Sequence, residues 1–146
     1  MPKPSTGLII ALAATGLFLS LVTAGIIATQ TVASNGTITT VNVGAYSNSD
    51  CTENCTSISW ESLYPGNSTS QIIYVKNTGT VPITLSMTAD SWEPTDADDY
   101  LTLTWNPEYE TLNPGQSTPA TLTLSAASDT GDLTTFNFNI IITGTE

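Results

Sequence analysis

The segment from Gln71 to Trp92 constrains the fold most, because its apolar side chains recur at every second residue. Ile83, Leu85, Met87 and Ala89 alternate with hydroxyl-bearing residues. A period of two is typical of a β-strand with one buried face and one solvated face. The segment therefore predicts a strand in an antiparallel sheet.

A turn divides this segment. Before the turn, Ile73 and Val75 share one face of a strand. Asn77-Thr-Gly79 then supplies an Asn and a Gly, which both tolerate left-handed backbone and suit a tight reversal. Pro82 has no backbone N–H and fits a strand start or a sheet edge. The sequence therefore predicts a β-hairpin here.

Further alternating runs predict the remaining strands, including one from about Thr37 to Ala45. The residues expected to face the core are Val41, Val43, Ala45, Ile58, Trp60, Leu101, Leu103, Trp105, Ala120, Leu122, Leu124, Ala126, Phe136, Phe138, Ile140 and Ile142. About seven such strands, separated by turn signals, predict an all-β, Ig-like antiparallel β-sandwich.

The phrase Leu-x-Pro-Gly-x-Ser-Thr occurs twice, at residues 63–69 and 112–118. Pro sets a negative φ and Gly accepts the positive φ that follows it in a type II turn. We interpret the repeat as two equivalent sheet corners and not as a ligand motif.

Residues 7–28 carry no charge. A helix of this length spans about 33 Å, which is enough for a hydrocarbon core of about 30 Å. A secretory signal has a shorter apolar stretch of about 7–15 residues, so a retained transmembrane anchor is favoured. Thr31-Val-Ala33 leaves the alternative of a signal peptide cleaved before Ser34.

Lys3 on the short side of the apolar segment, and an acid-rich remainder on the other side, place the C-terminal part outside the cytoplasm. We therefore expect a cell-surface or extracellular protein, either membrane-anchored or secreted after cleavage. Its parts are a cytoplasmic tip (1–6), the membrane segment (7–28), a linker (29–36) and the sandwich domain (37–146).

The formal net charge is −11, from 2 basic and 13 acidic residues, and the chain has no His. Such a surface repels phosphate backbones, so no nucleic-acid partner is expected. The only basic residues are Lys3 and Lys76, so Arg is absent too. Without His or Arg the chain lacks the commonest general base and the usual anion clamp, and we expect no enzyme.

Cys51 and Cys55 are the only cysteines. A structural zinc ion takes four ligands, and no His or further Cys could complete the set. In an exported protein the pair predicts a disulfide, which closes so small a loop that it contributes only about 2 kcal/mol. A redox-active pair is the alternative.

An acidic run includes Asp90, Glu93, Asp96, Asp98 and Asp99. Clustered carboxylates could coordinate Ca²⁺, although the spacing of an EF-hand loop is absent. A solvated acidic loop is the alternative, and no other cofactor is expected.

Three N-x-S/T sequons begin at Asn35, Asn54 and Asn67, all in the expected linker or loops. Glycans could be solvated there, so we expect N-glycosylation at these positions if the host glycosylates.

Leu63-x-Pro-Gly-x-Ser followed by Tyr74-Val-Lys-Asn-Thr-Gly79 resembles exported bacterial and archaeal β-sandwich domains, including camelysin/TasA-type fibre proteins. The chain also resembles archaeal pilin-like subunits, in which a hydrophobic helix that begins much as Gly7-Leu-Ile-Ile does precedes an Ig-like head. The basic residue that precedes the processing site in such pilins is replaced here by Pro4-Ser-Thr6. These resemblances imply an exported surface protein that can self-associate.

Two functions remain in competition. The first is a structural or adhesion protein of the cell envelope, with one Ig-like domain on a membrane anchor. The alternative is a subunit of an extracellular filament, assembled through its helix or by donating an N-terminal strand to a neighbour's sheet.

Overall fold

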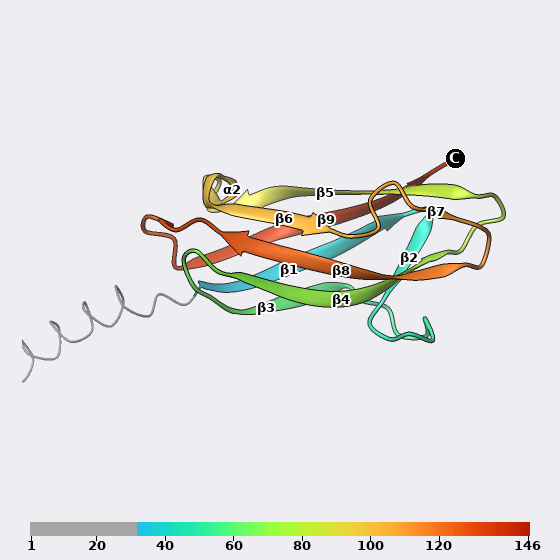
Figure 1. Ribbon diagram of the computed structural model, residues 1–146, viewed down its shortest axis with the longest axis horizontal. Coiled ribbons are helices and arrows are strands. Elements are labelled where there is room, and N and C mark those ends of the chain that lie inside the picture. The colour runs from blue at the N-terminus through green and yellow to red at the C-terminus, as the bar shows by residue number, and fades with distance from the viewer. Residues whose placement is uncertain (1–31) are drawn as a thin grey trace, which may run out of the picture. The chain divides into compact units, whose positions relative to one another are not determined.

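The computed structural model describes residues 32–146, which form an all-β domain of two sheets (Figure 1). The expected membrane segment, residues 7–28, lies outside the described residues. Within residues 32–146, no helix has the length and apolar character needed to span a bilayer. The elements are β1 (Val32–Val41), β2 (Val43–Tyr46), β3 (Ser57–Leu63), β4 (Ser68–Asn77), β5 (Ile83–Glu93), α2 (Ala97–Tyr100), β6 (Leu101–Trp105), β7 (Thr111–Leu112), β8 (Ser117–Ala126) and β9 (Thr135–Thr145).

One sheet has five strands in the order β3-β1-β9-β5-β7, and the other has four in the order β2-β4-β8-β6. Every pair of neighbours is antiparallel except β1 and β9, which run parallel. The first strand of the described chain therefore lies inside a sheet, hydrogen-bonded to strands on both sides (Figure 1).

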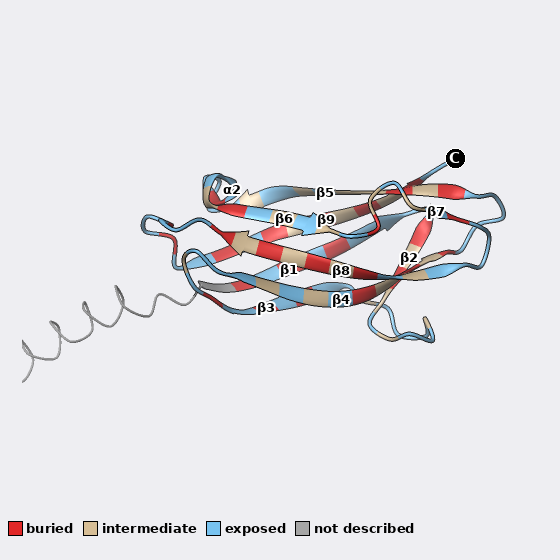
Figure 2. Ribbon diagram, viewed as in Figure 1, coloured by how far each residue is buried: buried red, intermediate tan, exposed pale blue. Residues whose placement is uncertain are grey.

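The inward faces predicted from alternation are confirmed for most strands. Ala120, Leu122, Leu124 and Ala126 of β8 are buried, and Figure 2 shows buried and intermediate bands alternating along this strand. Phe136, Phe138, Ile140 and Ile142 of β9 are buried opposite them, as are Ile58 and Trp60 of β3. Leu101 is also buried, whereas Leu103 and Trp105 are only partly covered.

The hairpin predicted between residues 71 and 92 is wrong. β4 and β5 lie in different sheets and do not pair, so the chain crosses between the sheets after Asn77. The buried Asn77 side chain supports this crossing, because its Nδ2 donates to the carbonyls of Val81 (2.7 Å) and Leu112 (3.0 Å). Its Oδ1 accepts the Gly79 N–H at 2.9 Å. The Asn77 amide thus bonds to Gly79 and Val81 within the crossing segment and to Leu112 of β7.

The single strand predicted from Thr37 to Ala45 is also wrong. Its residues belong to β1 and β2, which lie in different sheets and are separated by Asn42 at φ 60°. This left-handed residue reverses the alternation, so Val43 and Ala45 are buried while Val41 is 44% exposed. Separating these strands and adding the two-residue β7 gives nine strands within residues 32–146, where about seven were expected.

The linker predicted at residues 29–36 is wrong for its described part. Residues 32–36 belong to β1, with Ser34 paired to Trp60 of β3 and to Phe136 of β9. The Ser-Asn-Gly composition suggested a loop, but backbone bonds to two flanking strands override such local preferences. The domain therefore begins by Val32 and not at residue 37.

The two Pro-Gly turns are equivalent corners, as predicted. Gly66 and Gly115 both have φ 78°, and each turn closes with an i to i+3 bond. In each, the Gly N–H also donates to the end of the neighbouring strand, to Ala127 O in one and to Asn77 O in the other. The corners therefore hold the two ends of the β4–β8 pair in the same way.

Candidate functional sites

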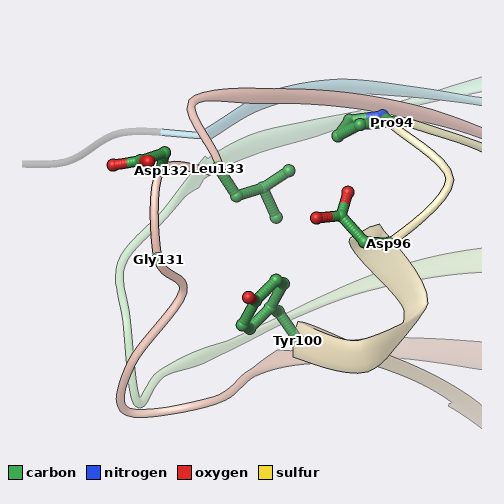
Figure 3. A pocket seen from close by; sticks show the side chains of 6 residues that line it. All are labelled: Pro94, Asp96, Tyr100, Gly131, Asp132 and Leu133. Atoms are coloured by element: carbon green, nitrogen blue, oxygen red, sulfur yellow. The ribbon is translucent and has the colours of Figure 1, made fainter.

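The acidic segment after β5 lies beside the loop that connects β8 to β9, and a pocket of about 310 Å³ separates them. Asp96 and Tyr100 line one side, and Gly131, Asp132 and Leu133 line the other. The Asp96 carboxylate points into this pocket, whereas the Asp132 carboxylate points away from it (Figure 3). The pocket thus presents one carboxylate and one tyrosine rather than a cluster of acids.

The calcium site suggested by Asp90, Asp96, Asp98 and Asp99 is not assembled. No three His, Cys, Asp or Glu side chains within residues 32–146 gather closely enough to hold a metal ion. Asp90 is part of β5, while Asp98 and Asp99 lie in the short helix α2 and are exposed. These carboxylates therefore lie on different elements and do not converge on one point.

Cys51 and Cys55 are both free thiols in this structure, so the predicted disulfide is not formed here. Each is half-buried, and the sulfurs donate to different carbonyls, Cys51 to Ser49 and Cys55 to Ser57. Burial raises the pKa of the Cys55 thiol, because it disfavours the charged thiolate. A disulfide in the oxidised protein stays a prediction.

The three sequons occupy different settings. Asn35 is an exposed residue in the middle of β1, between β3 and β9, and not in a linker. Asn67 closes the first Pro-Gly turn and is exposed. Asn54 is exposed in the β2–β3 connection and forms an isolated bridge with Tyr46. All three side chains reach solvent, and their glycosylation stays a prediction.

The tryptophans belong to the core and its margins. Trp60 is 1% exposed, while Trp92 and Trp105 are half-buried against the core. The Trp105 indole N–H donates to the Glu108 carboxylate. None of the three forms an exposed aromatic platform.

Sequence reasoning missed the space between β3 and β9 that β1 fills, which we call the β1 slot. β1 points three small or medium residues, Ser34, Gly36 and Ile38, toward the core. A Cβ at Gly36 would lie 3.1 Å from Ile140 Cδ1 and 3.2 Å from Trp60 Nε1, so the neighbours fill this space. Ser34 Oγ and Trp60 Nε1 are buried without a hydrogen-bond partner. The Asn35-Gly36 pair inside an alternating pattern was the available signal.

Comparison with known proteins adds no family assignment to this geometry. The sequence matches no protein-family model, and no curated protein is significantly similar to it.

Proposed function

We propose that this chain is a non-enzymatic structural protein of the cell surface, with an Ig-like domain displayed on a membrane segment formed by residues 7–28. The observation that carries this proposal is the position of β1, the first described strand after that segment. β1 is not a peripheral strand, because it pairs with β3 along one edge and with β9 along the other.

This position suits a domain that is held by its N-terminal end. β1 pairs with β9 from Ala33 to Val41 in one uninterrupted parallel register. A pull along β1 loads those hydrogen bonds together rather than one at a time. Unfolding under force is governed by the unfolding rate, and loading many bonds at once slows it. A tether attached through β1 would therefore transmit force into the centre of the sheet.

The alternative function is a filament subunit whose β1 is donated to a neighbouring copy. The same slot favours it, since removing β1 would leave unpaired edges on β3 and β9 and an apolar groove between them. The small inward residues Ser34 and Gly36, and the unpaired Ser34 hydroxyl, show that β1 contributes less to the core than β8 or β9 does. The two functions differ in whether β1 pairs within its own chain.

A disulfide trap separates them. Thr37 and Asn139 are register partners on the outer face of the five-stranded sheet, and neighbouring strands lie about 4.8 Å apart, which allows a disulfide. Thr37→Cys with Asn139→Cys is made in the full chain, with Cys51→Ser and Cys55→Ser to remove the native thiols. Oxidised protein is then analysed on non-reducing gels and by light scattering.

An anchored domain gives a cross-link within one chain and the mass of one copy. A donated strand gives a covalent ladder of copies, which would replace the first proposal with the second. Thr37→Cys with Thr123→Cys, on the other sheet, is the matched control and should form no rapid cross-link. If residues 37 and 139 form no cross-link, either within one chain or between copies, β1 does not pair with β9 and both proposals fail.

A further inference from the structure

A groove of about 330 Å³ runs along β2, between that strand and residues 54–56, and we call it the β2 groove. No residue that lines it is charged, although the described residues carry 13 carboxylates and one lysine, Lys76. Its volume lies at the lower end of the range of about 300–1,000 Å³ for small-molecule pockets. The lining therefore offers no charged partner to an ion, and the groove has room for one small uncharged group.

An aromatic ring, that of Tyr46, lines this groove beside a glycine. Tyr46 and Gly44 both line it, and a Cβ at Gly44 would lie 2.5 Å from Tyr46 Oη and 2.6 Å from Tyr46 Cε2. The ring can therefore lie against the strand only because residue 44 is glycine. The ring therefore packs against Gly44 and also lines the groove, where a ligand can meet it. Tyr combines an apolar face with a polar tip, which suits an amphipathic ligand.

Hydrogen-bonding groups line the groove together with this ring. Thr40, Thr56 and Thr78 contribute hydroxyl-bearing side chains and Asn54 contributes an amide. The walls are fixed by backbone bonds of 2.9 Å, from Ile38 N to Thr56 O and from Cys55 N to Ala45 O. Because these walls are already ordered, a ligand would meet little cost of ordering them.

We propose that the β2 groove binds one neutral sugar ring, stacked on Tyr46. A sugar ring has an apolar C–H face for the tyrosine and several hydroxyls for the Thr and Asn54 side chains. The absence of charge in the groove selects against uronic acids and amino sugars with a free amine, since a buried unpaired charge is costly. Specificity thus comes from shape and hydroxyl contacts.

The sugar can come from a free glycan or from a glycan attached at Asn54. Asn54 lines the groove and bridges to Tyr46, whereas Asn35 and Asn67 do not line it. Attachment joins Asn54 Nδ2 to the anomeric carbon of an activated glycan donor. The bond from that carbon to the donor's pyrophosphate carrier breaks, and the amide loses one proton. The first sugar would then lie beside the Tyr46 ring.

The first experiment uses the full chain from a host that does not N-glycosylate, in a polyoxyethylene detergent that contains no sugar. Methyl glucoside, methyl mannoside, methyl galactoside and N-acetylglucosamine are titrated while the amide resonances of Gly44 and Asn54 are followed by NMR. We expect at least one to bind with a Kd of about 1 mM, and glucuronate to bind more weakly. Tyr46→Ala should weaken binding at least about tenfold, while Tyr46→Phe should retain it.

Tyr64→Ala, at an exposed tyrosine in the first Pro-Gly turn, is the matched control and should leave binding unchanged. The second experiment uses protein from a host that N-glycosylates. Peptide mass spectrometry determines occupancy of Asn54, and NOEs are measured between sugar protons and the Tyr46 ring. A glycan seated in the groove gives these NOEs, and Tyr46→Ala changes the shifts of the first sugar.

The two experiments distinguish the sources, because binding only in the first indicates a free glycan and contacts only in the second indicate the Asn54 glycan. The proposal is overturned if no neutral sugar binds and no glycan contacts Tyr46. It is also overturned if Tyr46→Ala and Tyr64→Ala have equal effects.

Discussion

Trp92 of β5 stacks on Phe138 of β9, with ring centroids 4.2 Å apart and planes only 13° from parallel. Trp60 of β3 stacks on the same Phe138 ring at 6.2 Å and 17°. Phe138 therefore connects three strands of the five-stranded sheet through aromatic contacts, which add to the effect of burial.

Phe138→Ala should lower the free energy of unfolding by about 3–5 kcal/mol, because it leaves a cavity between the two tryptophans. That is a large share of the roughly 5–15 kcal/mol available to a domain. Urea unfolding followed by tryptophan fluorescence measures the loss. Thr123→Ala, on the outer face of β8 and half-exposed, should cost less than about 1 kcal/mol. Equal losses at the two positions would contradict the core position of Phe138.

Asn77→Ala should cost about 2–3 kcal/mol, because it leaves two carbonyls and one N–H without their partner at the crossing between sheets. The midpoint of urea unfolding reports the change. Asn137→Ala removes the same amide from an exposed position on β9 and serves as the control. A loss no larger than that of the control would mean that the amide does not stabilise the crossing.

Gly36→Val should destabilise the domain by about 1–3 kcal/mol, because the added methyl groups overlap Ile140 and Trp60 in a space that is already filled. Thr37→Val, one residue along and exposed, should change stability by less than about 0.5 kcal/mol. Thermal unfolding of the two variants makes the comparison. Tolerance of valine at residue 36 would show that β1 is not seated tightly between β3 and β9.

Protein taken from an oxidising compartment should resist alkylation at Cys51 and Cys55 until it is reduced, as expected for a disulfide between them. Intact mass with and without reductant detects the difference. Reduction should leave most of the stability, since the closed loop is short and the apolar core supplies the main driving force. Two reactive thiols without reductant would contradict the disulfide.

In the reduced protein, Cys55 should make stability fall as the pH rises. Its pKa is raised by burial in the folded state, so the unfolded chain releases the proton first. Below the unfolded thiol pKa both states are protonated and Cys55 has no effect. As the pH rises through that value, the unfolded state binds fewer protons and is favoured. The difference between wild type and Cys55→Ser should therefore change across this range, and a constant difference would contradict the shift.

Alternation predicted the inward face of most strands, because it records burial on one side of a sheet, but it failed at Val41, which lies next to the left-handed Asn42. It does not record which strand is the neighbour. A hairpin and a crossing between sheets both keep Ile73, Val75, Ile83 and Leu85 inward, so the partner of β4 could not be predicted. In the structure, the Asn77 side chain bonds to the carbonyls of Val81 and Leu112 at the crossing.

The type II corners were predictable because Pro-Gly determines its own backbone angles, and Gly66 and Gly115 adopt the same φ. By contrast, the left-handed Asn42 and the strand conformation of residues 32–36 depend on contacts with distant segments. The β2 groove could not be foreseen either, since it joins Thr40, Tyr46 and Thr78 from separate parts of the chain. The sequon at Asn54 and the neighbouring Cys55 were the sequence features that indicated that region.

The pairing of β1 with β9 has a consequence for biogenesis. The first described strand finds its parallel neighbour only after the last one has been made, as in the pair Thr37 and Asn139. About a hundred residues separate them, which takes a ribosome roughly 5–20 s to translate. Contacts between such distant residues also slow folding. Until residues 135–145 have been made, β1 therefore has no parallel neighbour and the five-stranded sheet stays incomplete.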